Sequence, residues 1–204
     1  MDAIQLFLHN HARTHSSAMT EMEGNVPFED VIFGGLSEEQ LRIRPAEQLN
    51  SLVWLLWHMA RTEDVNINVI LSSNPQVLEE GDWLRRLNVD RADMGAGMTD
   101  GEVGDFTSRV NIEALRTYRA AVGRRTREVV LAMRPEELDE PIDMANVRRA
   151  FELGAIAPGA AWIEGFLAGK PKAFTLGHAA TGHSFLHIGE AMCIRSLAGF
   201  GLPV

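Results

Sequence analysis

Length, composition and charge limit the class of protein before any motif is considered. The chain has 204 residues, of which 46% are hydrophobic and 23% are charged, enough for one globular domain with a full core. Its single cysteine, Cys193, excludes an internal disulfide framework. A formal charge of −9 at pH 7 gives no long-range attraction for phosphate backbones, so we expect no nucleic-acid partner.

Neither a secretory signal nor a membrane span is expected. Residues 1–10 contain Asp2 and no basic segment, unlike a signal peptide. The most apolar run, residues 52–60, is far shorter than the roughly 20 residues that cross a bilayer. We therefore expect a cytoplasmic protein without a membrane partner.

Helical patterns dominate the first part of the chain. The spacing of apolar residues predicts a first helix over residues 3–23, which ends at Gly24-Asn25. Pro27 fits the first turn of a short helix that reaches Phe33. Residues 37–40, Ser-Glu-Glu-Gln, form a capping box that begins another short helix.

The middle of the chain contains two more predicted long helices. The second long helix covers residues 51–71, and its stretch 52–60 is apolar nearly all round, as in a helix buried on most sides. Residues 76–98 are predicted to be a loop with a short helix, with Trp83 as its anchor. A capping box at Thr99 begins a third long helix, predicted over residues 99–133.

The last part of the chain contains a fourth long helix, over residues 174–197. Short helices are expected before it, over residues 143–152 and 159–168. Alternating segments joined by tight turns are lacking, so an all-β fold is not expected. We predict an all-α fold, an antiparallel four-helix bundle with short extra helices in its connections, as a single domain over residues 1–204.

Three histidines form the principal candidate site. His183 and His187 are four residues apart, which places both imidazoles on one helix face where they can bind one ion. His58, within the apolar second helix, could complete a set of three nitrogen ligands with an open position. His178 precedes His183 by five residues, about 140° around an α-helix, and is expected to miss the site.

A histidine-containing core without an ion is the competing interpretation. Two histidines four apart on a helix often have no ligand role, and a histidine in an apolar segment is commonly a core residue bonded to a carbonyl. Burial of three imidazoles without an ion is costly, however. The residues alone therefore leave both interpretations open.

Acidic residues near these histidines are candidates for hydrogen bonds that orient the imidazole rings. Glu190 follows His187 by three residues and could orient its ring. Glu63 follows His58 by five residues and is a second candidate. The competing interpretation is that its carboxylate faces solvent.

Three aromatic residues and three further histidines lie outside the candidate ligand set. Candidate pocket walls, for which core packing is the competing role, are Trp54, Trp57 and Phe185. The histidines of the first helix, expected to face solvent or the seam between helices, are His9, His11 and His15.

Several short motifs follow one another along nearly the whole chain. They are residues 35–41 (GLSEEQL), 44–46 (RPA), 51–64 (SLVWLLWHMARTED), 182–190 (GHSFLHIGE) and 197–199 (LAG). Together these motifs resemble the DinB-like family of metal-binding four-helix bundles. In that family one histidine of the second helix and an H-x-x-x-H pair of the fourth bind a divalent metal. The resemblance therefore implies that His58, His183 and His187 are metal ligands, with zinc or nickel as the expected ion.

The resemblance also implies a class of chemistry. Related bundles include mycothiol-dependent maleylpyruvate isomerases and S-transferases that use mycothiol or bacillithiol, in which the metal activates the thiol. We therefore expect a divalent-metal-dependent thiol S-transferase or isomerase that activates a low-molecular-weight thiol or water towards a small-molecule substrate. The family also makes a homodimer plausible.

Two other hypotheses belong to different classes. In one, the chain is a non-catalytic metal-binding stress-response bundle in which the ion stabilises the fold. In the other, the bundle holds no ion and acts through dimerisation. Metal analysis separates the third hypothesis from the first two, and a thiol-conjugation assay separates the first from the second.

Overall fold

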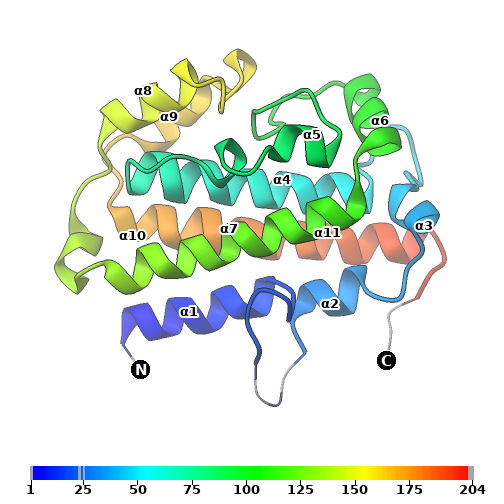
Figure 1. The fold of residues 1–204 in the computed structure, drawn as a ribbon, viewed down its shortest axis with the longest axis horizontal. Helices are drawn as coiled ribbons and strands as arrows, with labels where there is room; N and C mark the ends of the chain where they lie inside the picture. The colour runs from blue at the N-terminus through cyan, green and yellow to red at the C-terminus, as the bar shows by residue number, and fades with distance from the viewer. Residues whose placement is uncertain (1, 23, 25, 202–204) are drawn as a thin grey trace.

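The four longest helical segments of the protein pack side by side (Figure 1), in a computed structural model that describes residues 2–22, 24 and 26–201. These segments are α1 (Ala3–Thr14), α4 (Leu52–Asp64) continued by the π-helix η1 (Val65–Leu71), α7 (Ile112–Ala132), and the π-helix η5 (Leu176–Gly182) continued by α11 (His183–Leu197). Within the described residues no β-strand is present, apart from an isolated bridge between Pro141 and Pro171. The predicted all-α class is confirmed.

Contacts between residues of neighbouring helical segments show in which direction each segment runs. Glu63 of α4 contacts Thr126 of α7, and Ile67, further along, packs with Val130, so these two segments run in the same direction. Asn50, just before α4, contacts Glu190 of α11, whereas His58 contacts His183, so α4 and α11 are antiparallel. The pair α4 and α7 therefore departs from the predicted antiparallel order, because the long connection between them carries the chain back to the end where α4 begins.

Shorter helices occupy the connections. Those before and after α4 are α2 (Phe28–Phe33), α3 (Glu38–Arg42), η2 (Val77–Glu79), α5 (Trp83–Leu87) and α6 (Asp100–Arg109). Those between α7 and η5 are η3 (Pro135–Asp139), α8 (Met144–Glu152), η4 (Pro158–Ala160), α9 (Trp162–Leu167) and α10 (Lys172–Thr175). In Figure 1, α8 and α9 lie together at one end of the bundle, above α4 and α10.

α4 is the central helix, and all of its residues are buried. Ser51 caps it by accepting a hydrogen bond from the Trp54 backbone N–H. Its apolar side chains form the main core with those of α6, α7 and α11. This burial explains why the sequence of α4 has no polar face.

Two predicted helices end earlier or divide. The first ends at Thr14, not near residue 23, because His15 adopts an extended backbone and turns its ring into the core. The predicted helix over residues 99–133 is two helices, α6 and α7, separated at Val110 and Asn111. Asn111 begins α7 because its side chain accepts a hydrogen bond from the Ala114 backbone N–H.

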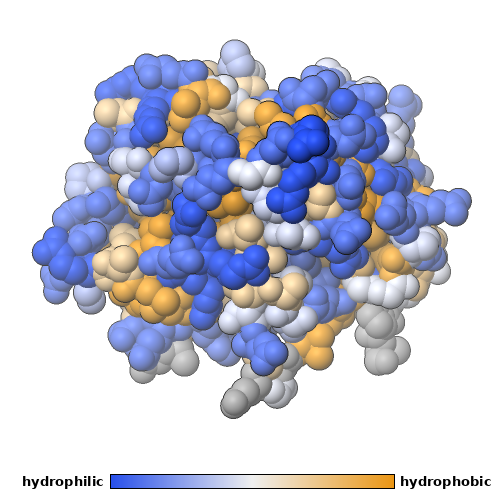
Figure 2. Space-filling view, in the orientation of Figure 1, coloured by the Kyte–Doolittle hydropathy of each residue, from blue (hydrophilic) through white to orange (hydrophobic). Residues whose placement is uncertain are grey.

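The surface has the mixed character of an ordinary globular protein. Figure 2 shows a face on which hydrophilic and hydrophobic residues are interspersed. Among the described residues, no helix combines the length and apolarity needed to cross a membrane.

Candidate metal centre

Three imidazoles from two antiparallel helices converge in the bundle. His58 lies in the middle of α4, and His183 and His187 lie in the first two turns of α11. One ring nitrogen from each histidine lies within 4.8 Å of the other two. The His58 ring centroid is 4.9 Å from the centroids of both His183 and His187. This is the arrangement of a three-nitrogen metal site.

Hydrogen bonds at the outer ring nitrogens orient two of the three imidazoles. Nδ1 of His58 lies against the backbone carbonyl of Met94, and Nδ1 of His187 is 2.8 Å from Oε2 of Glu190. With Nδ1–H as the donor in both, each Nε2 keeps its lone pair for a ligand role. Asn50 in turn donates to the other oxygen of Glu190 at 2.8 Å, so this carboxylate is itself held in place.

The inner nitrogens fit a bound cation. Nε2 of His183 and Nε2 of His187 are 3.1 Å apart. Two lone pairs at this distance repel unless a proton or a cation lies between them. The buried Nδ1 of His183 has no hydrogen-bond partner within the described part of the chain. The donor set, three imidazole nitrogens, is one that zinc, nickel and related divalent ions accept.

Burial keeps His58 and His183 neutral, and the neutral imidazole is the form that binds metals. Burial, with a smaller contribution from the nearby His187, lowers the pKa of His58 to about 4. Burial, together with His58 and His187, lowers the pKa of His183 to about 2. For Glu190, burial raises the pKa, but the hydrogen bonds from His187 and Asn50 outweigh burial and lower it, so the carboxylate remains charged.

A glycine allows the loop before α6 to reach His58. Gly95 has a φ of +83°, and a Cβ at this position would lie 2.5 Å from Cζ3 of the buried Trp57. Only glycine fits both the backbone conformation and the space. It follows Met94, whose carbonyl orients His58, so the close approach of this loop is part of the site.

A small pocket adjoins the three histidines. Its volume is about 110 Å³. Its lining comes from α4 and η1, the loop before α6, α9, and the segment from α10 to α11: His58, Thr62, Asn66, Met94, Ala96, Trp162, Ile163, Phe166, Leu167, Thr175, His178, Ala179 and His183. A ligand in this pocket would lie directly beside two of the three histidines.

Comparison with known proteins identifies the family. The family model of the DinB superfamily matches residues 30–191, which include all three histidines. The chain belongs to the DinB superfamily. A conserved protein from Enterococcus faecalis, known from a crystal structure, shares the fold with a TM-score of 0.68 and 20% identity, over 98% of this chain and 99% of that one. No curated protein matches significantly.

As predicted, His178 lies outside the group of three histidines in this DinB protein, but it lines the adjoining pocket. Residues 176–182 form a π-helix, in which the His183 backbone N–H bonds to the carbonyl five residues earlier, that of His178. A turn of this π-helix therefore holds more residues than the 3.6 of an α-helix, and five residues come closer to one full turn, so His178 lies nearer the face of His183. The His178 ring lines the pocket, with its centroid 6.1 Å from that of His183.

The three aromatic residues proposed as pocket walls, and Glu63, do not share one environment in the structure. Trp54 stacks on the His58 ring at 4.7 Å, whereas Trp57 is fully buried against Phe106. Phe185 contacts Phe28 of α2 and does not line the pocket. Glu63 contacts none of the three histidines, because five residues along an α-helix turn its side chain about 140° away from His58.

Glu63 instead belongs to a second buried cluster in the DinB fold. It contacts Nε2 of His11 and Nε2 of His15, each at 2.8 Å and through different carboxylate oxygens, and accepts a hydrogen bond from Thr126 at 2.6 Å. Residue types allow this group to hold a metal ion. Since each Nε2 already has a hydrogen-bond partner, we interpret the cluster as structural. His11 and His15 lie in the seam between helices, and His9 is exposed.

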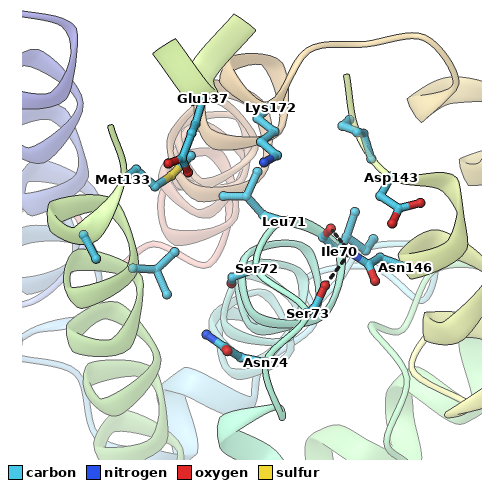
Figure 3. A pocket seen from close by; sticks show the side chains of 13 residues that line it. Ile70, Leu71, Ser72, Ser73, Asn74, Met133, Glu137, Asp143, Asn146 and Lys172 are labelled. Atoms are coloured by element: carbon cyan, nitrogen blue, oxygen red, sulfur yellow. Dashed lines mark hydrogen bonds between the residues drawn. The ribbon is translucent and has the colours of Figure 1, made fainter. Parts of the chain in front are cut away.

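A larger pocket lies elsewhere and does not include the three histidines (Figure 3). Its volume is about 440 Å³, and it lies between the end of η1, the end of α7 and the start of α8. Asn146 donates a hydrogen bond to Ser73 across one wall, at 2.7 Å. Among the described residues that line it, Lys172 is the one lysine or arginine, and it is paired with Glu140 at 2.7 Å, so these residues present no free cation to an anionic ligand.

Proposed function

We propose that this DinB-superfamily protein is a metal-dependent thiol S-transferase. His58, His183 and His187 would hold a divalent ion, with zinc or nickel as first candidates, and the substrates would be a low-molecular-weight thiol and an electrophilic small molecule. The observation that carries the proposal is the convergence of three imidazole nitrogens beside a pocket. An open position next to a cavity is typical of catalytic sites, since structural sites are usually closed by a fourth ligand.

The chain's own residues would bind the ion and orient the histidine rings that hold it. A divalent ion bound there lowers the pKa of a thiol or water molecule that binds it. Glu190 and the Met94 carbonyl keep the rings of His187 and His58 in position. In the reaction, the thiol sulfur would form a bond to the electrophilic carbon, the leaving group would depart with its bonding electrons, and the thiol proton would pass to solvent.

Removal of one ligand tests this function. His58→Ala should reduce bound metal from about one ion per chain to none detectable, because two imidazoles hold a divalent ion far less tightly than three. It should also abolish conjugation of mycothiol, bacillithiol or glutathione to chlorodinitrobenzene. Elemental analysis of untagged protein measures the first effect, and absorbance of the conjugate measures the second. His9→Ala, which changes an exposed histidine, is the matched control.

The outcome distinguishes an enzyme from a metal-stabilised bundle. Loss of conjugation with an unchanged melting temperature supports the transferase. If His58→Ala lowers stability by several kcal/mol and wild type conjugates none of the thiols, the ion has a structural role, as in a non-catalytic metal-binding bundle. Wild-type protein that takes up no metal excludes both.

A further inference from the structure

The pocket beside the three histidines has an aromatic wall formed by a segment outside the four long helices. Trp162 and Phe166 of α9 contact each other, with ring centroids 5.9 Å apart. Phe166 also contacts His178, at 5.1 Å, and His178 stacks on Phe174. Flat side chains therefore cover one side of the pocket, and the edge of this wall is open, since Trp162 is 63% exposed.

The size of the pocket limits what can enter. Its volume is about 110 Å³. A protein cavity of about 150 Å³ lined by apolar side chains holds one benzene molecule. The pocket therefore accepts a group no larger than about one ring, and the body of a thiol such as glutathione has to remain outside it.

The side chains of the lining do not favour an anion in the part of the pocket away from the histidines. Among the described residues that line the pocket, none is a lysine or an arginine. Glu190, whose Oε2 is 2.8 Å from Nδ1 of His187, also places a negative charge beside the histidines. A carboxylate in the apolar part of the pocket would be buried without a partner, which is strongly unfavourable. A dicarboxylate substrate, such as that of a maleylpyruvate isomerase, does not suit such a lining.

Two hydroxyl groups at the pocket lack partners. Oγ1 of Thr62 and Oγ1 of Thr175 are buried and make no hydrogen bond to any residue that the structure describes, although both residues line the pocket. A buried hydroxyl without a partner is uncommon in proteins and needs an explanation. A polar substituent on a bound ligand could satisfy either group after a rotation of the threonine side chain.

From these observations we infer that the pocket selects the electrophilic substrate: a neutral, compact molecule with one aromatic or similarly sized apolar group and a small polar substituent. The inference rests on the proposed function, because the ring in the pocket would lie beside the reacting centre. Trp162 and Phe166 are then specificity-determining residues, and the thiol approaches from outside the pocket.

Binding of a single-ring probe to the zinc-loaded full-length protein tests this inference. Isothermal titration should detect benzyl alcohol, and should show at least tenfold weaker binding of benzenesulfonate, an anion of comparable size that ligates zinc poorly. Ala96→Leu adds bulk to the pocket wall and should weaken the binding of benzyl alcohol at least tenfold. Trp162→Ala should weaken this binding severalfold. Leu131→Ala, which removes an exposed leucine of α7, should leave it unchanged.

Zinc affinity, measured by chelator competition on every variant, separates the two proposals. Unchanged zinc affinity with selective loss of benzyl alcohol in Ala96→Leu supports the inference. If zinc binds but benzyl alcohol does not, or binds Ala96→Leu equally well, the inference is wrong and the metal site stands. If the wild type binds no zinc, the proposed function fails, and the inference that rests on it fails too.

Discussion

At the scale of single residues, the candidate metal centre depends on groups outside the three histidines. Glu190 and the Met94 carbonyl each contact an Nδ1 atom, which determines the ring nitrogen left free to face the centre. Groups that form hydrogen bonds to the ligand histidines affect metal affinity without contacting the ion. Glu190 is the one of the two that mutation can remove, because the other is a backbone carbonyl.

Glu190→Ala should lower zinc affinity by about 10- to 100-fold, since the His187 ring loses the acceptor that orients it. Glu190→Gln keeps an acceptor oxygen at this position and should lose less. Chelator competition measures both, and Glu152→Ala, an exposed change on α8, serves as the control. Wild-type affinity in Glu190→Ala would show that Glu190 has no orienting role.

A second residue-scale feature is the tight contact between α7 and the turn after α1. A Cβ on Gly123 would lie 2.7 Å from Cε1 of His15 and 2.7 Å from Cγ of Met19, both of which are buried. These neighbours come from the segment where the chain leaves α1 and His15 enters the core. The glycine thus permits His15 and Met19 to approach α7 this closely.

Gly123→Ala should lower the free energy of unfolding by about 1–2 kcal/mol, because the added methyl overpacks His15 and Met19 by more than the helix preference of alanine compensates. Urea unfolding measures the change. Gly189→Ala, in α11 with open space around it, should instead raise stability by about 0.5–1 kcal/mol. Equal effects of the two substitutions would refute the overpacking argument.

At the scale of elements, the sequence predicts what depends on local periodicity. The spacing of four between His183 and His187 is enough to place both rings on one face, and the apolar stretch around His58 is enough to bury it. The shared face of His183 and His187 and the burial of His58 could therefore be predicted from the residues. The family motifs added the pairing of α4 with α11, which periodicity alone does not determine.

What could not be predicted depends on irregular helices and distant contacts. The π-helical geometry of residues 176–182 brings His178 to the pocket, and no residue pattern marks it as different from an α-helix. The loop that holds Met94 is joined to the α8–α9 segment by a backbone hydrogen bond, from the Met94 N–H to the Ala155 carbonyl. Such pairs are far apart in sequence and depend on the complete fold.

At the scale of the whole molecule, α4 separates two histidine clusters of different character. On one side it faces α11, with His58 beside a pocket; on the other it faces α1 and α7, with Glu63 fully enclosed. Arg119 and Glu29 form a buried ion pair next to this enclosed cluster, at 2.6 Å. Stability at neutral pH therefore depends on titratable groups that have no access to solvent.

The enclosed cluster makes stability depend on pH. Burial lowers the pKa of His15 to about 3, although Glu63 opposes this shift. Burial raises the pKa of Glu63, but His15 and His11 outweigh burial and hold it well below its usual range. In both cases the unfolded chain binds more protons than the folded chain at acidic pH. Stability therefore falls as the pH is lowered, from about 6.5 for His15 and from about 4.5 for Glu63.

The metal-free protein should accordingly lose free energy of unfolding between pH 6.5 and pH 4, and His15 alone should contribute up to about 1.4 kcal/mol per pH unit in this range. Urea unfolding at half-unit steps of pH measures the slope. In His15→Gln, which keeps an N–H donor for Glu63 but cannot titrate, the slope should be smaller by that amount. The raised pKa of the buried Glu29 acts in the opposite direction in both proteins, so it cancels in the comparison. Identical slopes would mean that His15 is protonated in the folded state, as an imidazolium paired with Glu63.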